Sequence, residues 1–382
     1  MEASLSVAVA LVLAAWVSLE LRITSAFLEI VAGVILAAMF GDMSELNWLH
    51  FLANLGVVAL MFTAGFEVDM RRLRWMWRGC LTLGASAFVV PLAAVFTVAY
   101  LWMGLPLAGA GVVAIGLSTT SLALVYQALK EKGMLRTGEG QALLAGATVV
   151  DVLSMVSLAF LMGDFGWGSA TVVLVVVGTA VGLPRVGKWV FWRYSGSLAE
   201  PELRFLLLVI MGMGFLAESV GGIHPAVVAF AIGVAMSRVV VEHEAVEQKL
   251  KGVVFGLFAP VFFFRAGTEL EISAITPEVL MGAGVLLVVA LAAKFAGTYA
   301  PARWMLGIDG VRAGLAFNYR LSFGVIAAGA GLSSGLIDQS IYAMMLLVVL
   351  VSALVPALAL RDAPRVRPPA EETDESRSGT AP

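Results

Sequence analysis

The sequence is poor in charged residues. They make up 13% of the 382 residues, whereas hydrophobic residues make up 60%, and the mean hydropathy is +0.95. A soluble domain carries about 25% charged residues, which cover its surface. Because this chain has so few, most of its surface must face something other than water, and lipid is the simplest candidate. The net charge of −3 is too small to indicate a charged partner.

Cysteine and histidine are scarce as well. Cys80 is the one cysteine, which excludes an internal disulfide framework and the common cysteine-based metal sites. The three histidines, His50, His224 and His243, lack the spacing of metal ligands. The sequence holds no GxGxxG motif, no nucleophile–base arrangement and no run of aromatic residues among basic ones. We therefore expect no enzyme activity, no cofactor and no nucleic-acid partner.

Apolar segments of membrane-spanning length fill most of the chain. A spanning helix needs about 20 apolar residues. The first segment lacks the positive n-region of a secretory signal, so we expect a transmembrane helix there rather than a cleaved peptide. The sequence predicts an all-α polytopic membrane protein with about 13 transmembrane helices, at residues 3–20, 23–41, 50–67, 78–102, 107–129, 139–163, 168–192, 202–220, 224–241, 252–268, 278–304, 310–333 and 338–360. The tail, 361–382, is rich in Pro, Ser and charge, and we expect it to be disordered.

The basic residues alternate between the connections of these segments. Of the 24 Lys and Arg residues, 21 fall in every second connection or in the tail, and the opposite connections hold acidic residues instead. Cytoplasmic loops carry the excess of Lys and Arg in membrane proteins. The pattern therefore predicts an N-terminus outside and a C-terminus in the cytoplasm, which requires an odd number of spans.

Three ionisable residues fall near the middle of predicted helices: Asp151, Lys294 and Arg320. A charge at mid-membrane costs at least about 2.5–3.5 kcal/mol on insertion scales and indicates a functional site. One alternative is an ion pair between Asp151 and Lys294 that only fixes helix register, although such a pair rarely repays its desolvation. Arg320 cannot release a proton at usable pH, so we expect it to order broken backbone or to pair with an acid. Arg265 can reach Glu269, one turn on, in a structural pair.

Two of the predicted helices are interrupted by polar runs. Four hydroxyl residues follow one another from Ser118 to Ser121 in segment 107–129, and Asn318, Arg320 and Ser322 interrupt segment 310–333. Such runs are where transporter helices unwind and expose backbone groups to ions. The alternative is that the hydroxyls bond back to their own helix.

The positions of these runs indicate an internal repeat. With 168–192 as a linker helix, repeat one covers about 3–163 and repeat two about 202–360, and each interrupted helix is the fifth of its six. The two halves begin on opposite sides of the membrane. We therefore expect an inverted repeat with two discontinuous helices.

Several short motifs, in order and at fitting spacing, resemble the monovalent cation:proton antiporter superfamily, specifically its second branch of Kef- and NapA-like exchangers. The resemblance covers about residues 20–360. It is carried by Glu29 in EIVAGVILAAMFG, Gly65-Phe66-Glu67, Thr120-Ser121 followed by KEKG, Asp151 in GATVVDVLS, Ala259-Pro260-Val261-Phe262-Phe263, Lys294 in AAKFAG and Arg320 in NYRLSFG.

This resemblance implies a fold and a site. The fold is NhaA-type, in which two discontinuous helices cross, and a six-helix core moves as an elevator against a dimerisation domain. Asp151 matches the residue that binds the cation (Na⁺, Li⁺ or K⁺) and exchanges it for protons. Lys294 matches its charge partner, and Thr120, with Ser121 beside it, lies at the crossover. The resemblance also implies a homodimer in a bacterial inner membrane.

The chain departs from the family pattern at two places. Many relatives have Asp-Asp or Asn-Asp where this chain has Val150-Asp151, and the usual Arg-Gly-Glu is Arg320-Leu321-Ser322 here. With one carboxylate left, we expect electroneutral exchange of one cation for one proton. Two other readings stay open at this point: a sodium-coupled symporter of the bile-acid type, and a non-transporting membrane sensor derived from an antiporter.

Overall fold

A computed structural model describes residues 2–21, 23–41, 43, 46–66, 77–134, 137–163, 167–194, 200–220, 225–241 and 243–361. All regular secondary structure in these ranges is helical. The helices of the first half are α1 (Glu2–Leu21), α2 (Ser25–Phe40), α3 (Asn47–Phe66), α5 (Trp77–Thr97), η1 (Val98–Trp102), α6 (Leu107–Ser118), α7 (Leu122–Glu131), α8 (Gly138–Met162) and α9 (Trp167–Tyr194).

The second half of the chain is also helical. Its helices are α10 (Pro201–Val220), α11 (Pro225–Val241), α12 (Glu244–Val253), η2 (Val254–Phe258), α13 (Ala259–Thr268), η3 (Ile272–Ala274), α14 (Pro277–Trp304), α15 (Gly310–Ala316), α16 (Leu321–Ser333) and α17 (Gln339–Arg361). η1 and η2 are π-helical turns inside longer helices, and η3 is a short 3₁₀ turn. Most of the expected tail and the Glu67 of the Gly-Phe-Glu motif lie outside the described residues.

Seven of the described helices are long and apolar enough to cross a membrane, or eight if the bent pair of α15 and α16 forms one span. Three shorter apolar stretches, in α2, α6 and α11, fall below that length. The all-helical membrane fold is therefore confirmed, and the number of about 13 spans stays a prediction. The predicted segments nevertheless each coincide with a helix or with a pair of consecutive helices.

Both polar runs interrupt their helices in the structure. The first break separates α6 from α7 at residues 119–121, and the second separates α15 from α16 at residues 317–320, where the two parts are bent by 42°. A hydroxyl that bonds to a nearby carbonyl competes with the helix ladder, which explains why helices end in such runs.

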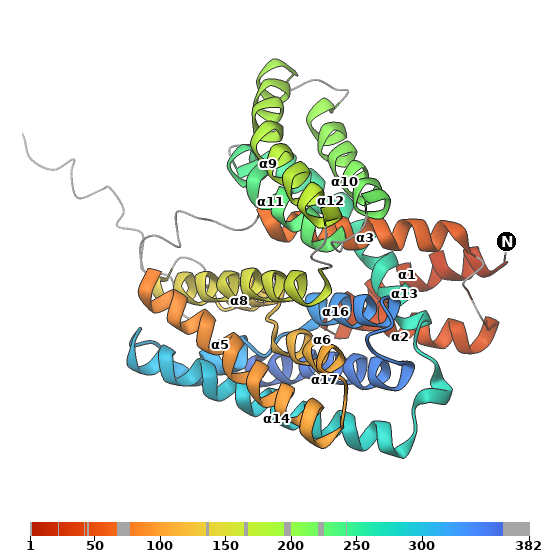
Figure 1. Ribbon diagram of the computed structural model, residues 1–382, viewed down its shortest axis with the longest axis vertical. Coiled ribbons are helices and arrows are strands. Elements are labelled where there is room, and N and C mark those ends of the chain that lie inside the picture. The colour runs from red at the N-terminus through yellow and green to blue at the C-terminus, as the bar shows by residue number, and fades with distance from the viewer. Residues whose placement is uncertain are drawn as a thin grey trace, which may run out of the picture.

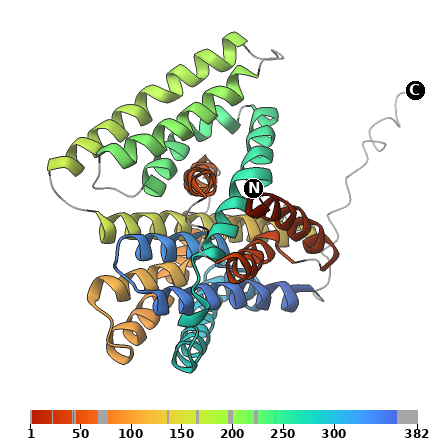
Figure 2. The same ribbon diagram turned by 90° about the vertical axis from the view of Figure 1, so that its right-hand side faces the viewer.

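The helices gather into two bundles, which Figures 1 and 2 show from two sides. The first bundle holds α1, α2, α3 and the helices from α9 to α13, and the second holds the helices from α5 to α8 and from α14 to α17. The bundles meet where α8 packs against α11 and where α16 packs against α13. Each bundle thus takes helices from both halves of the chain.

Two close helix crossings in the first bundle mirror each other. In one, α3 packs against α11 through Gly65 and Gly233, where a side chain on either glycine would overlap with backbone of the other helix. In the other, α2 packs against α13 through Gly33 and Gly267 in the same way. Small residues let helix backbones approach closely in membranes, where packing drives association.

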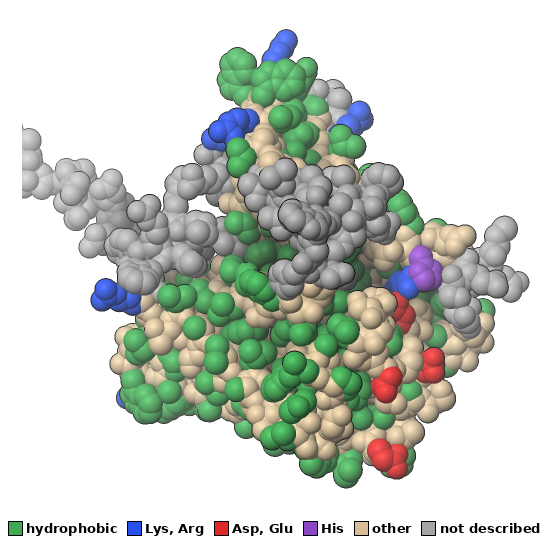
Figure 3. All heavy atoms as spheres, viewed as in Figure 1, with side chains coloured by type: hydrophobic (Ala, Val, Ile, Leu, Met, Phe, Trp, Pro, Cys, Tyr) green, Lys and Arg blue, Asp and Glu red, His purple; other side chains and the backbone are tan. Residues whose placement is uncertain are grey.

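Charged side chains are unevenly spread over the surface. In Figure 3 the acidic side chains in view gather toward one end of the molecule, the end at which Figure 1 marks the N-terminus, and most basic ones lie at other edges. Much of the remaining surface in view is apolar, and Trp16, Trp192 and Val288 are among the large exposed hydrophobic residues. Such a surface suits lipid rather than water.

Candidate functional site

The two helix breaks lie against each other in the second bundle. The Ser121 backbone N–H donates to the Tyr319 carbonyl oxygen at 2.6 Å, and the Thr120 hydroxyl donates to the Phe317 carbonyl oxygen at 3.1 Å. The hydroxyl oxygens of Ser121 and Ser322 are 3.3 Å apart. The breaks therefore satisfy part of each other's polar backbone, which a buried interruption requires.

Not all hydroxyls of the first run take part in this crossing. Ser118 donates to the Ala114 carbonyl at 2.6 Å, and Thr119 donates to the Gly116 carbonyl at 3.0 Å, so both bond back to α6. The alternative reading, in which the hydroxyls bond back to their own helix, thus holds for Ser118 and Thr119. Thr120 and Ser121 are the pair that links the breaks.

Lys294 is fully buried in α14 and reaches the end of the broken helix. Its ammonium donates to the carbonyl oxygen of Ser118, the last residue of α6, at 2.5 Å. The C-terminus of a helix carries a partial negative charge, so a cation is stabilised there. The charges of Asp151 and Arg320 both act on this ammonium.

Arg320 is also fully buried and orders the second break, as its residue type suggested. Its Nη2 donates to the side-chain oxygen of Asn318 and to the carbonyl of Ala290, each at 2.7 Å. Ala290 lies one turn before Lys294 on α14, so the arginine ties the break to the turn that carries the lysine. Its Nε and Nη1 have no hydrogen-bond partner among the described residues.

Asp151 lies in the middle of α8 and lines a small cavity at the crossing. The cavity measures about 50 Å³ and is lined also by Thr120, Ser121 and Ser322, and by Thr63 from α3 of the first bundle. A water molecule occupies about 30 Å³ in the liquid. The space therefore suits one largely dehydrated monovalent cation or very few water molecules.

The first turns of two half-helices also face this cavity, through Leu122 of α7 and Phe323 of α16. Helix N-termini carry a partial positive charge, which stabilises a nearby carboxylate. The cavity thus combines one carboxylate, several hydroxyl oxygens and two helix N-termini in a largely apolar surrounding. Chemically, this arrangement can hold a monovalent cation or a proton on the same carboxylate.

The structure separates the predicted site residues into two sets. Asp151, Thr120 and Ser121 share the cavity, whereas Lys294 and Arg320 do not line it. Lys294 bonds to the end of α6, and Arg320 bonds to the backbone of α14 and to the Asn318 side chain of the second break. Thr63 and Ser322 line the cavity but were not assigned to the site from sequence. Thr63 is a single hydroxyl in an apolar helix, and this was the one signal that could have pointed to it.

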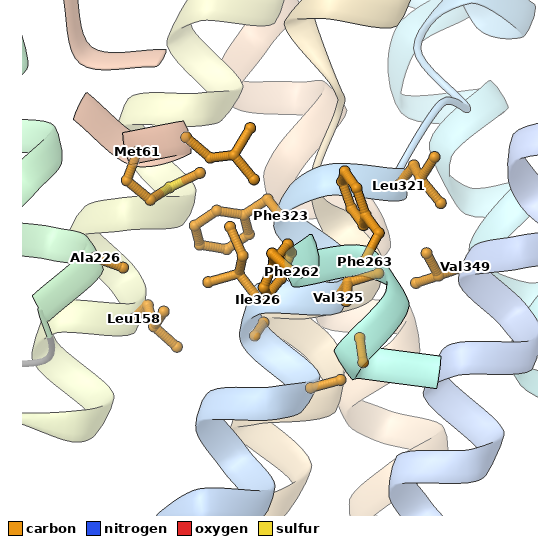
Figure 4. Close-up of a cluster of buried hydrophobic side chains, with 14 of the residues drawn as sticks. Met61, Leu158, Ala226, Phe262, Phe263, Leu321, Phe323, Val325, Ile326 and Val349 are labelled. Carbon is orange, nitrogen blue, oxygen red and sulfur yellow. The ribbon is translucent and has the colours of Figure 1, made fainter. Parts of the chain in front are cut away.

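A second, much larger cavity of about 720 Å³ lies between the bundles. Residues 51–58 of α3 and 325–333 of α16 line it, whereas residues 60–64 and 322–323 of the same helices line the small cavity. The two cavities share no lining residue among those described. Apolar side chains, including Met61, Phe262, Phe323 and Ile326, fill the space between the helices at this level (Figure 4).

The sequence as a whole matches one protein family. The family described as "Sodium/hydrogen exchanger, transmembrane" matches residues 7–361. The chain belongs to this family. Membership confirms the resemblance drawn from the motifs, and it confirms that the chain is an integral membrane transporter and not an enzyme.

Individual members of the sodium/hydrogen exchanger family align over most of this chain. It is 28% identical over 359 residues to the Na⁺/H⁺-K⁺ antiporter GerN of Bacillus cereus, covering 90% of each chain. It is 27% identical over 357 residues to a Na⁺/H⁺ antiporter of Enterococcus hirae, covering 87% of this chain and 90% of the relative. The solved structure of MjNhaP1, a sodium proton antiporter from Methanocaldococcus jannaschii, has a similar fold, with a TM-score of 0.69 at 14% identity over 94% of this chain and 96% of the other.

Proposed function

We propose that this sodium/hydrogen exchanger family member exchanges a monovalent cation, Na⁺, Li⁺ or K⁺, for protons, with Asp151 as the shared binding group. The observation that carries the proposal is the small cavity in which the mid-membrane carboxylate meets the two broken helices. Among the relatives, GerN is named as a Na⁺/H⁺-K⁺ antiporter and the Enterococcus hirae protein as a Na⁺/H⁺ antiporter.

The cation's ligands are oxygen atoms. Monovalent cations lose water when carbonyl, hydroxyl or carboxylate oxygens replace it. Thr120 donates its proton to Phe317, so its oxygen lone pairs stay available to a cation. The same holds for Thr63, whose hydroxyl proton lies within reach of the Ala59 and Leu60 carbonyl oxygens of its own helix. Ser121 and Ser322 add two more hydroxyl oxygens.

The buried bases balance the charge of the site. When no cation is bound, the Asp151 carboxylate and the Lys294 ammonium attract each other across the crossing. A bound cation neutralises Asp151, which leaves Lys294 beside the permanent charge of Arg320, and the lysine then releases a proton; in the alternative route, the cation displaces a proton from Asp151 itself. One cation is thereby exchanged for one proton, and the cycle moves no net charge.

The two cavities support an alternating-access mechanism for this exchange. The apolar side chains of Figure 4 include residues that line each cavity, Phe262 and Ile326 for the large one and Met61 and Phe323 for the small one, and in this proposal they close the path between the two. Residues 325–333 of α16 line the large cavity, and Gly329, in the middle of this stretch, lies seven residues after Ser322. Because a helix rises 1.5 Å per residue, a shift of α16 by about 10 Å along its axis brings Ser322 to the middle of that cavity wall. An elevator movement of the second bundle against the first supplies this shift.

The wider setting is part of the same proposal. The mirrored Gly65–Gly233 and Gly33–Gly267 crossings support an inverted repeat with α9 as linker helix. The chain acts as a homodimer in a bacterial inner membrane, with its N-terminus outside and its C-terminus in the cytoplasm. The distribution of basic residues supports this orientation.

Proteoliposomes with an internal pH dye test the function. Addition of Na⁺, Li⁺ or K⁺, but not choline, moves protons in vesicles that hold the wild type, and Asp151→Asn abolishes the signal. Glu139→Gln is the matched control, because it also neutralises an acid of α8 but one that pairs with Arg312 away from the cavity. Equal signals from the wild type and Asp151→Asn would remove Asp151 from the mechanism.

A further inference from the structure

Among the described residues that line the small cavity, Thr63 alone brings a side-chain oxygen from the first bundle. It is buried, with 2% of its surface exposed, and its hydroxyl proton is directed to carbonyl oxygens of its own helix. The oxygen lone pairs therefore remain for a ligand in the cavity. The other side chains that bring oxygen atoms to this cavity all belong to the second bundle: Thr120, Ser121, Asp151 and Ser322.

Thr63 lies near the end of α3 that the distribution of basic residues places at the cytoplasmic side. Residues 60–64 of α3 line the small cavity, and residues 51–58, nearer the other end of the helix, line the large one. In the proposed orientation the small cavity is therefore the inner of the two. The cation site contacts Thr63 in this inner position.

The proposed elevator movement separates Thr63 from the rest of the site. A shift of the second bundle by about 10 Å carries Asp151 past about seven residues of α3. Seven residues make nearly two full turns of a helix, so the matching position on the same face of α3 is Gly56. This glycine has no side chain, and it packs closely against Phe258 and Phe262. The shifted site thus meets no hydroxyl in place of Thr63.

Asn54 is the one polar side chain of α3 among the described residues that line the large cavity. It precedes Thr63 by nine residues, which places it half a turn around the helix and about 13 Å along its axis. A site that moves by about 10 Å and stays on the face of Thr63 does not meet this amide. Asn54 therefore does not take over the role of Thr63.

We propose that Thr63 binds the cation in the inner-facing state only, so that the site binds cations more tightly from the cytoplasm than from the outside. This inference rests on the proposed function and orientation. An oxygen that replaces one water of a dehydrated cation stabilises the bound ion, and a ligand shifts a conformational equilibrium by its differential affinity for the two states. The gradients at equilibrium depend only on stoichiometry. Thr63 instead sets the face that saturates at low cation concentration, which favours export.

Membrane vesicles of uniform orientation test the difference between the two faces. Everted vesicles of a bacterial host without its own sodium antiporters present the cytoplasmic face to added Na⁺, and right-side-out vesicles present the outer face. With a pH dye inside and equal starting pH on both sides, the measured quantity is the Na⁺ concentration that gives half-maximal proton movement. Li⁺ and K⁺ are tested in parallel. For Thr63→Val, we expect this concentration to rise roughly tenfold at the cytoplasmic face and less than about twofold at the outer face.

Three further variants make the result specific. Thr120→Val removes a ligand of the moving bundle and weakens binding equally at both faces. Thr63→Ser keeps the hydroxyl and preserves the wild-type difference between the faces. Thr148→Val removes a buried hydroxyl of α8 that bonds back to Leu144 and does not line the cavity, so both values stay unchanged.

The outcomes separate this inference from the proposed function. Equal shifts at both faces, a larger shift at the outer face, or no shift from Thr63→Val contradicts a role of Thr63 in one state only, even where Thr120→Val weakens binding as expected. Absence of any effect of Thr120→Val contradicts the proposed cation site itself. Thermal unfolding of Thr63→Val in detergent, at the wild-type temperature, shows that a change in binding does not come from misfolding.

Discussion

The Lys294 ammonium lies 2.5 Å from the carbonyl oxygen of Ser118, the residue at which α6 ends. A buried lysine thus caps the negative end of a broken helix, while Asp151 lies near the positive ends of α7 and α16. The charged residues that are costly in a bilayer are here matched to the backbone charges that helix breaks create. The crossing and the buried charges therefore stabilise one another.

Replacement of Lys294 tests this capping. Lys294→Gln leaves Asp151 without its nearby countercharge and weakens the bond to Ser118, so we expect a loss of about 1–3 kcal/mol in stability, seen as a lower unfolding temperature in detergent. Lys294→Arg keeps the charge and preserves most of the stability, but it slows exchange because a guanidinium does not release its proton. Full exchange by Lys294→Arg would show that proton release by this residue is not needed.

Thr120 is predicted to bind the cation as well as to join the breaks. Thr120→Val keeps the shape but removes the oxygen, so the apparent affinity for the cation falls about tenfold, which corresponds to about 1.4 kcal/mol. Thr119→Val removes a neighbouring hydroxyl that bonds back to Gly116 of its own helix, and its effect on affinity is small. The measurement is the concentration dependence of cation-driven proton movement in proteoliposomes. Equal effects of the two valine substitutions would contradict the assignment of Thr120.

The close packing of α3 against α11 at Gly65 predicts that Gly→Ala lowers stability there more than at a glycine that faces open space. Gly65→Ala places a methyl group against the backbone of α11, so we expect a loss of about 1–3 kcal/mol from overpacking. At Gly284 of α14 a methyl group meets open space, and Gly284→Ala leaves stability unchanged or raises it slightly. Thermal unfolding of the two variants in detergent compares them directly. A neutral Gly65→Ala would mean that α3 and α11 do not pack this closely.

Electroneutral exchange is predicted from the single carboxylate of the cavity. One cation replaces one proton in each cycle, so the membrane potential does not shift the equilibrium of exchange. The measurement uses vesicles in K⁺-free solution, clamped at different potentials by a gradient of a permeant anion such as thiocyanate, with Na⁺ as the transported ion. A pH gradient at equilibrium that varies strongly with potential would show that more than one proton moves per cation.

The sequence predicted the helices and the helix breaks well, because both have local causes. Apolar length determines the helices, and the hydroxyl run from Ser118 to Ser121 determines the first break. Mid-membrane charge singled out Asp151, Lys294 and Arg320 without any coordinates. The number of spans was less predictable, since α2, α6 and α11 are apolar but too short to meet the length of a span on their own.

Contacts between residues far apart in the sequence could not be predicted, because no local pattern indicates them. Thr63 comes from the other bundle, about 90 residues from Asp151, and only packing brings it to the cavity. Sequence reasoning paired Arg265 with Glu269 because they are one turn apart, and the structure confirms that pair at 2.7 Å. It gave no reason to expect His50 beside them, because that contact joins residues 215 positions apart.

The competition between a cation and a proton for Asp151 can be measured on the purified protein. Na⁺, Li⁺ or K⁺ is added to protein in weakly buffered detergent solution, and the released protons are counted with a pH indicator. The account predicts about one proton per chain from the wild type and from Glu139→Gln, and none from Asp151→Asn. Proton release from Asp151→Asn at the wild-type level, or none from the wild type with any of the three cations, would contradict it.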